Sequence, residues 1–239
     1  MLSNRDALSR ASHELRTPLH AILGFGQLLA LDSLSESQRH SVEQIIAGGH
    51  HLLSLIEDLL DLSRVGDLSI GPLDVGEEIA HAAALCRPLA DERSLSVEIE
   101  LSDAPPVTLA DRRRLKQILL NLVSNAIKYN RPGGTLTLRA GQGPDDQVRI
   151  EVIDTGRGMT EAELGRLFVP FERLGAARLG IEGNGLGLAV SKTLAEAMGG
   201  TIDVESTPDE GTVFMLLLPG AEAAEGAPAL QAPQLAGVR

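Results

Sequence analysis

Asn121-Leu122-Val123-Ser124-Asn125-Ala126-Ile127-Lys128-Tyr129 is the most informative stretch of this chain of 239 residues. It ends a segment, 110–128, whose apolar periodicity predicts a helix. Asn121, Asn125 and Lys128 share one face of that helix, because residues three or four apart are neighbours. Amide oxygens suit a hard Mg²⁺ ion that keeps several waters, and a lysine neutralises phosphate charge. The stretch therefore predicts one wall of a phosphate-binding site.

Three later segments supply the rest of a nucleotide site. In Asp154-Thr155-Gly156-Arg157-Gly158-Met159 a carboxylate follows a predicted strand, where it can accept a hydrogen bond from an adenine amino group. Phe168-Val169-Pro170-Phe171-Glu172-Arg173 leaves Arg173 as a candidate contact of the γ-phosphate. Gly183-Asn184-Gly185-Leu186-Gly187-Leu188 opens a predicted helix and offers backbone N–H groups and the helix dipole to phosphates.

The elements around these segments predict a two-layer α/β sandwich with helices on one face of the sheet. Helical periodicity covers 77–92, 110–128 and 186–198, and strand-like patterns cover 96–101, 136–140, 148–153, 201–205 and 212–218. The composition after Pro219 is rich in Ala, Gly, Pro and Gln, which is typical of disorder.

Before residue 65 the sequence predicts an antiparallel helical hairpin. A heptad pattern defines the first helix, with His13 on its outermost stripe and Pro18 at a position expected to kink it. A capping box at Ser35-Glu36-Ser37-Gln38 starts the second helix, which should end near Arg64. The predicted buried seam of the first helix consists of Leu8, Ala11, Leu15, Pro18, Ile22, Phe25 and Leu29.

A seam shared by only two helices stays partly wet, so we expect a homodimer whose two hairpins form a four-helix bundle. The register points His13 into solvent, with Glu14 beside it and Thr17 one turn further on.

The composition excludes several classes of protein. A net charge of −12 argues against nucleic acid as a partner. No apolar run is long enough to span a bilayer and no signal peptide opens the chain, so we expect a cytoplasmic location and no membrane contact within this chain. The full-length protein could be soluble or membrane-anchored. Cys86 is the single cysteine, which excludes an internal disulfide.

These motifs together resemble the catalytic core of a bacterial sensor histidine kinase of two-component signalling, over residues 3 to 219. The run His13-Glu14-Leu15-Arg16-Thr17-Pro18 resembles the phosphoacceptor box of that family, and the four segments above resemble its N, G1, F and G2 boxes in order. Gly211-Thr212-Val213-Phe214 resembles its closing motif. The resemblance implies a dimerisation and phosphoacceptor hairpin (1–65), a linker (66–72), a gyrase-type ATP-binding domain (73–219) and a disordered tail (220–239).

The resemblance also implies roles for individual residues. His13 would attack the γ-phosphate of ATP through Nε2, and Glu14 would draw the proton from Nδ1. Asn125 would bind Mg²⁺, with Asn121 assisting, and Asp154 would read adenine with Thr212 close by. The other implied nucleotide contacts are Lys128, Tyr129 and Arg173, which would face phosphates, Leu186 and Leu188 in the last loop, and Gly156, Gly158, Gly185 and Gly187, which would hinge a lid over about 160–184.

The phosphate would then pass to an aspartate of a response-regulator receiver domain. Thr17 resembles the position that holds the attacking water in the reverse, phosphatase reaction.

Two other function classes stay open. ATP hydrolases and ATP-driven clamps share this nucleotide fold, but they carry a glutamate base where this chain has Asn121, and an amide cannot accept that proton. A non-catalytic dimeric scaffold would have lost nucleotide binding, which an ATP-binding assay would test. At the residue level, Glu14 could instead form a plain helical ion pair with Arg10, and Asn121 and Asn125 could be surface amides.

Overall fold

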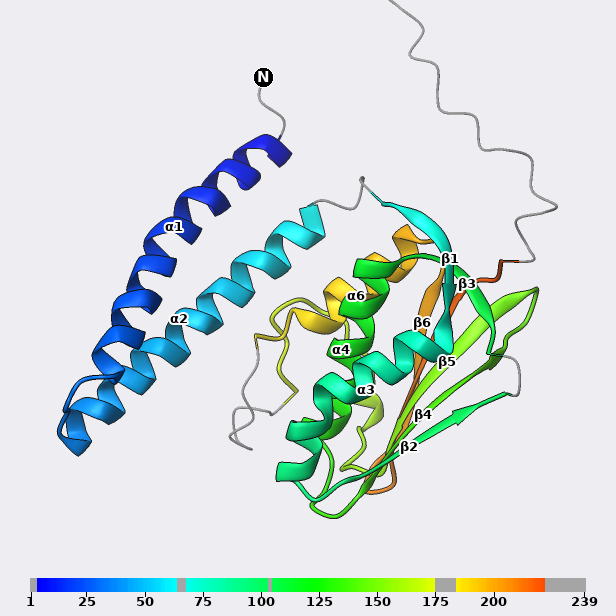
Figure 1. The fold of residues 1–239 in the computed structure, drawn as a ribbon. Coiled ribbons are helices and arrows are strands. Elements are labelled where there is room, and N and C mark those ends of the chain that lie inside the picture. Colours follow the sequence, from blue (N-terminus) through cyan, green and yellow to red (C-terminus); the bar gives the residue numbers. More distant parts are fainter. Residues whose placement is uncertain (1–3, 64–67, 103–104, 175–183, 222–239) are drawn as a thin grey trace, which may run out of the picture.

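The computed structural model describes residues 4–63, 68–102, 105–174 and 184–221 (Figure 1). For residues 4–14, 50, 51, 54, 55 and 57–63 it describes the backbone alone. The chain forms a helical hairpin followed by a mixed α/β domain.

The hairpin consists of α1 (Asn4–Ala30) and α2 (Glu36–Ser63), which run antiparallel. Pro18 lies inside α1, and the helix continues beyond it. The predicted capping box starts α2: the Ser35 N–H donates to Oε1 of Gln38 at 3.0 Å, and the Gln38 N–H donates to Oγ of Ser35 at 3.3 Å.

The two helices contact each other through a different stripe from the predicted seam. Leu19, Leu23 and Val42 are buried between them, and Gly49 lets α2 approach Leu23 closely. The described seam residues Leu15, Pro18, Ile22, Phe25 and Leu29 are exposed instead. Within the single chain the predicted seam is therefore not the stripe that contacts α2, and its burial between two hairpins stays a prediction. The physical reason is that α1 is apolar on two faces, and a heptad pattern does not say which partner covers which face.

The second domain contains two sheets. β1 (Ile70–Asp74) and β3 (Val107–Asp111) pair antiparallel in a two-stranded ribbon. The main sheet has the order β2-β4-β5-β7-β6, with β2 (Ser96–Leu101) parallel to β4 (Thr135–Gln142) and the other pairs antiparallel. The remaining strands are β5 (Gln147–Asp154), β6 (Thr201–Thr207) and β7 (Gly211–Pro219).

Three helices cover one face of the main sheet: α3 (Val75–Glu92), α4 (Arg112–Lys128) and α6 (Gly187–Ala197). Alternate residues of the strands are buried against them, such as Val148, Ile150 and Val152 of β5. The residues between, such as Arg149 and Glu151, point to the other face and form ion pairs there. The predicted hairpin and two-layer α/β sandwich are confirmed.

Three short elements have no counterpart in the sequence prediction: β1, β3 and α5 (Glu161–Leu164). Residues 70–72, which fall in the expected linker, form the first half of β1. Residues 110 and 111 belong to β3, so α4 begins at Arg112, where the Asp111 side chain accepts the N–H of Arg114.

The expected tail is described only at its start, where Gly220 and Ala221 donate backbone hydrogen bonds to Asp146 and Val107. Residues 222–239 lie outside the described part. None of the helices within the described residues has the length and apolar character that crossing a bilayer requires.

Candidate nucleotide site

The cavity of the second domain, about 520 Å³ in volume, lies along a polar stripe of α4. Gln117, Asn121, Ser124, Asn125 and Lys128 form this stripe and line the cavity. They share one face because they are spaced by three or four residues, while the opposite face of α4 is buried in the core. The helix thereby presents amides, a hydroxyl and an ammonium group to the same space.

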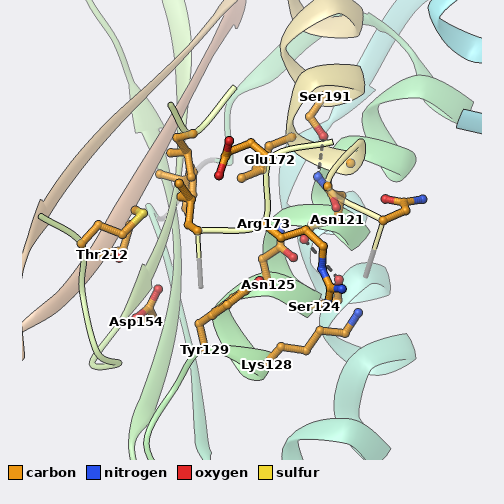
Figure 2. A pocket seen from close by; sticks show the side chains of 18 of the residues that line it. Asn121, Ser124, Asn125, Lys128, Tyr129, Asp154, Glu172, Arg173, Ser191 and Thr212 are labelled. Carbon is orange, nitrogen blue, oxygen red and sulfur yellow. Dashed lines mark hydrogen bonds between the residues drawn. The ribbon is translucent and has the colours of Figure 1, made fainter. Parts of the chain in front are cut away.

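Asp154 ends β5 at the opposite side of the cavity from Lys128 (Figure 2). Asp154 is 6% exposed, and its Oδ1 accepts the Gly156 N–H at 2.8 Å. Burial raises the pKa of this carboxyl from 3.8 to about 6, and the N–H groups of Gly156 and Thr212 limit the rise. An ionised Asp154 in this position can accept a hydrogen bond from an exocyclic amino group of a purine.

Thr212 lies directly across from Asp154 in the β5–β7 pairing, as expected for two residues that serve one end of the site. Its hydroxyl is hydrogen-bonded to Oγ of Ser206 at 2.9 Å.

Two glycines of the site adopt backbone conformations that other residues avoid. Gly158 has φ +59°, and a methyl group there would lie 1.9 Å from the carbonyl oxygen of Thr207. Gly185 has φ +69°, and a methyl group there would lie 2.7 Å from the carbonyl oxygen of Glu172. Close backbone packing around the cavity therefore requires glycine at both positions.

The start of α6 is joined to α4 through Asn121. Its Nδ2 donates to Oγ of the buried Ser191 at 2.8 Å, and its Oδ1 would lie 2.3 Å from a methyl group on Gly187. Asn121 therefore fixes the N-terminal turn of α6, whose free N–H groups favour anions.

Arg173 extends over α4 toward Asn125 and Lys128 (Figure 2). Tyr129 lies between these three side chains and Asp154. Burial raises the pKa of Tyr129, and the nearby guanidinium groups of Arg157 and Arg173 oppose that rise. The cavity thus has a cationic and amide-rich end near α4 and a carboxylate end near β5. This asymmetry suits a nucleotide with its phosphates at the first end and its base at the second.

Most of the residues expected to bind nucleotide line this cavity, and two do not. Gly156 packs behind Asp154, and Leu186 is fully buried in the core. The side chains of His13 and Glu14 lie outside the described residues, while Thr17 is exposed on α1. The expected residues that line the cavity are Asn121, Asn125, Lys128, Tyr129, Asp154, Gly158, Arg173, Gly185, Gly187, Leu188 and Thr212.

Sequence reasoning missed several lining residues. Gln117 and Ser124 could have been found, because they fall on the same helical stripe as Asn121. Arg157 and Glu172 stand inside quoted motifs but received no role. Ser191 and Ala47 reach the cavity only through packing of α6 and α2, which leaves no local signal in the sequence.

Ala47 shows how the hairpin meets the second domain. It belongs to α2, which contacts α6, and it lines the cavity. The close approaches of Gly26 to Ile46 and of Gly49 to Leu23 put Ala47 level with the 23–26 turn of α1.

Within the described residues, no group of three or more His, Cys, Asp or Glu side chains could hold a metal ion. The oxygen donors at the phosphate end are amides and a hydroxyl, among them Asn125 and Ser124. This donor set fits Mg²⁺, which takes few protein ligands and completes its coordination with phosphates and water.

Two protein-family models match the chain. Residues 3–68 match the His Kinase A (phospho-acceptor) domain, and residues 110–222 match the histidine kinase-, DNA gyrase B-, and HSP90-like ATPase.

Similar proteins align with both parts of the chain. The cell-division control histidine kinase PdhS of Brucella anthropi is 34% identical over 89% of this chain and 22% of its own length. The histidine protein kinase DivJ of Caulobacter vibrioides is 39% identical over 89% of this chain and 36% of its own length. The crystal structure of full-length ShkA in complex with AMPPNP superposes with a TM-score of 0.78 at 36% identity, over 90% of this chain and 46% of that one. The chain thus spans between 22% and 36% of the two curated relatives.

Proposed function

This chain belongs to the histidine kinases, ATP-dependent phosphotransferases of two-component signalling, and from that premise we propose that it transfers the γ-phosphate of ATP to its own His13. The observation that carries the proposal is the cavity with a carboxylate at one end and Lys128, Arg173 and amides at the other. In this proposal the hairpin, residues 1–65, is the phosphoacceptor and the α/β domain, residues 73–219, is the phosphate donor.

The proposed chemistry is an in-line displacement. Nε2 of His13 forms a bond to the γ-phosphorus as the bond from that phosphorus to the β,γ-bridging oxygen breaks, and ADP leaves. Glu14 accepts the proton from Nδ1, which neutralises the imidazole as the N–P bond forms. Asp154 holds the adenine amino group, while Lys128, Tyr129 and Arg173 hold the phosphates.

Mg²⁺ would be held by Asn125 together with phosphate oxygens and water, and it would neutralise charge on the phosphates. Asn121 supports this end by fixing the first turn of α6 through Ser191. Nδ2 of Asn121 donates to Ser191, and its Oδ1 lies beside Gly187. We therefore propose that Asn121 holds the first turn of α6 and does not bind the metal.

The transfer also requires the ATP-binding domain to move along the hairpin. Ala47 borders the cavity at the level of Leu23, ten residues and about 15 Å along the α1 axis from His13. The phosphoacceptor domain implies a homodimer, so the acceptor histidine can belong to the same or to the partner chain.

We further propose that His13 passes its phosphate to an aspartate of a response-regulator receiver domain, in the cytoplasm where ATP is available. In the phosphatase reaction, which hydrolyses the phosphoaspartate of the regulator, Thr17 would hold the attacking water with its exposed side chain. Thr17→Ala should then slow the loss of phosphate from a receiver and leave autophosphorylation intact.

Incubation with Mg-ATP tests the main proposal. The protein should acquire phosphate that is labile in acid and stable in alkali. His13→Gln should lose this label and keep ATP binding, and Asn125→Asp should lose the label as well. His20→Gln is the matched control, because His20 is exposed on the same stripe of α1 and should leave the label unchanged.

Label that persists in His13→Gln would refute the assignment of the acceptor. Release of inorganic phosphate without any phosphoprotein would instead favour the hydrolase alternative. Failure of the wild type to bind ATP would favour the scaffold alternative.

A further inference from the structure

Three segments of the ATP-binding domain meet at the guanidinium group of Arg157. Its Nη2 donates to Oε1 of Glu163 at 3.1 Å and to the carbonyl oxygen of Leu174 at 3.1 Å. The guanidinium carbon lies 5.8 Å from the centre of the Tyr129 ring. The Arg157 side chain therefore connects α5, the end of the 168–174 segment and the end of α4.

The backbone of Arg157 is held as firmly as its side chain. Its N–H donates to the carbonyl of Tyr129 at 3.3 Å, and its carbonyl accepts the N–H of Asp209 at 2.7 Å. The side chain thus starts from a fixed point beside the cavity, which it lines.

Glu163, the anionic partner, is also fixed in advance. It accepts hydrogen bonds from both the N–H and the hydroxyl of Thr160 in a capping box at the start of α5. These bonds, and then the one from Arg157, lower the pKa of Glu163, so the carboxylate stays ionised near neutral pH. A partner that is already oriented costs little entropy when Arg157 binds it.

Leu174 is the residue after Arg173, and its backbone conformation needs support. It has φ +32°, and Phe171 has φ +65°, a region that residues with side chains occupy at a cost. The Phe171 N–H donates to the carbonyl of Gly185 at 2.9 Å, which holds one end of this segment. The bond from Arg157 to the Leu174 carbonyl holds the other end.

We infer that Arg157 is a positioning residue of the nucleotide site, which holds Arg173 in place for the terminal phosphate of ATP. The inference rests on the proposed function, because it takes Arg173 as the contact of the γ-phosphate. Arg157 acts through the Leu174 carbonyl next to Arg173 and through the Tyr129 ring, with Glu163 as its anchor. A partly exposed ion pair alone would contribute little, so the hydrogen bond to the carbonyl is the contact that matters for the site.

The test compares ATP with ADP, which lacks the γ-phosphate. Calorimetric titration of Arg157→Ala in the presence of Mg²⁺ should give a Kd for ATP raised about tenfold and a Kd for ADP raised less than about threefold. Arg157→Lys should recover only part of the ATP affinity, because a lysine is shorter and lacks the planar guanidinium group that lies over the Tyr129 ring. Glu163→Gln should weaken ATP binding less than Arg157→Ala does.

The matched control is Arg149→Ala, which removes an ion-paired arginine from the face of the main sheet that the helices leave uncovered and should leave both affinities unchanged. A double-mutant cycle completes the test: in an Arg173→Ala background, Arg157→Ala should no longer change the preference for ATP over ADP.

An equal loss of ATP and ADP affinity, together with a lower Tm, would mean that Arg157 only stabilises the domain and would overturn the inference. Unchanged ATP affinity in Arg157→Ala would also overturn it and would leave the proposed function intact. If the wild type bound no ATP, the proposed function itself would fail.

Discussion

Asp154 meets two opposing demands at the residue scale. Its burial raises the pKa to about 6, so folding favours the protonated carboxyl, whereas the proposed recognition of adenine needs the ionised form. Because the folded pKa lies above the unfolded value of 3.8, the contribution of this group to folding stability is fully present below about pH 4 and is lost as the pH rises through 6. At neutral pH Asp154 is therefore mostly ionised, which the proposed adenine contact needs and which lowers the stability of the fold.

The first prediction concerns the pH dependence of ATP binding. Affinity for ATP should be about tenfold lower at pH 5 than at pH 7, because only about a tenth of Asp154 is ionised one pH unit below its pKa. Fluorescence titration with a nucleotide analogue across this range would measure it. GTP, whose base carries a carbonyl where adenine has its amino group, is the control and should bind weakly at both pH values. A flat profile for ATP would show that Asp154 does not read the base through its charge.

The second prediction separates stability from binding at the same position. Asp154→Asn should raise the free energy of unfolding at pH 8 by up to about 3 kcal/mol, because it removes a buried charge and keeps an acceptor for the Gly156 N–H. The same change should abolish measurable ATP binding. Urea unfolding at pH 8 and at pH 4 would test the first part, since the gain should vanish at pH 4. A variant that is less stable than wild type at pH 8 would contradict the burial argument.

At the scale of elements, α1 is apolar on two faces, and among the side chains that the structure describes only one of these faces is covered. Leu19 and Leu23 contact α2, while Ile22 and Phe25 are 50% and 69% exposed. Phosphoacceptor domains pair in dimers, and this uncovered face is apolar enough to be buried against a second hairpin. We therefore expect one stripe to serve hairpin formation and the other to serve dimer formation.

Phe25→Glu should accordingly break the dimer and spare the hairpin. We expect the Kd of the dimer to rise at least about a hundredfold, because a charge would replace an aromatic side chain in the predicted interface. Sedimentation equilibrium would measure the dimer, and circular dichroism would report the helix content. Gln27→Glu is the control, since Gln27 is exposed on the stripe of His20. A dimer that survives Phe25→Glu would mean that another face pairs.

At the scale of the whole molecule, the ATP-binding domain contacts α2 through α6 and its cavity borders Ala47. In this arrangement the cavity lies away from the level of His13, the proposed phosphoacceptor, along the hairpin. The proposed transfer needs a second arrangement, in which the cavity reaches the level of His13. A mutation in the contact changes the ratio of the two arrangements by as much as it stabilises one more than the other, so even a small contact can control the movement of the domain.

Weakening this contact should therefore speed autophosphorylation. Ala47→Glu places a charge against the domain contact, and we expect the initial rate of His13 labelling at saturating ATP to rise about threefold, as the loss of a contact worth about 0.6 kcal/mol would give. Glu43→Gln, one turn earlier on the exposed surface of α2, is the control. A lower rate in Ala47→Glu would mean that the described contact belongs to the reactive arrangement.

Much of the fold and the site could be predicted from the sequence, because the signals are local. The capping box at Ser35, the polar stripe from Asn121 to Lys128 and the carboxylate at the end of β5 each depend on spacing within one element. The strands of the main sheet and the major helices follow from periodicity for the same reason. The short elements β1, β3 and α5 escaped, since four or five residues show too little periodicity.

Only the tertiary structure decided which surfaces meet. The sequence determined that α1 carries apolar stripes and that Asn121 and Arg157 stand in nucleotide motifs. The fold decided that Leu19 and Leu23, rather than Ile22 and Phe25, close the hairpin, and it joined Asn121 to Ser191 and Arg157 to Leu174. Periodicity is a property of neighbouring residues, whereas the choice of partner depends on packing between segments far apart in the chain, and no local pattern records it.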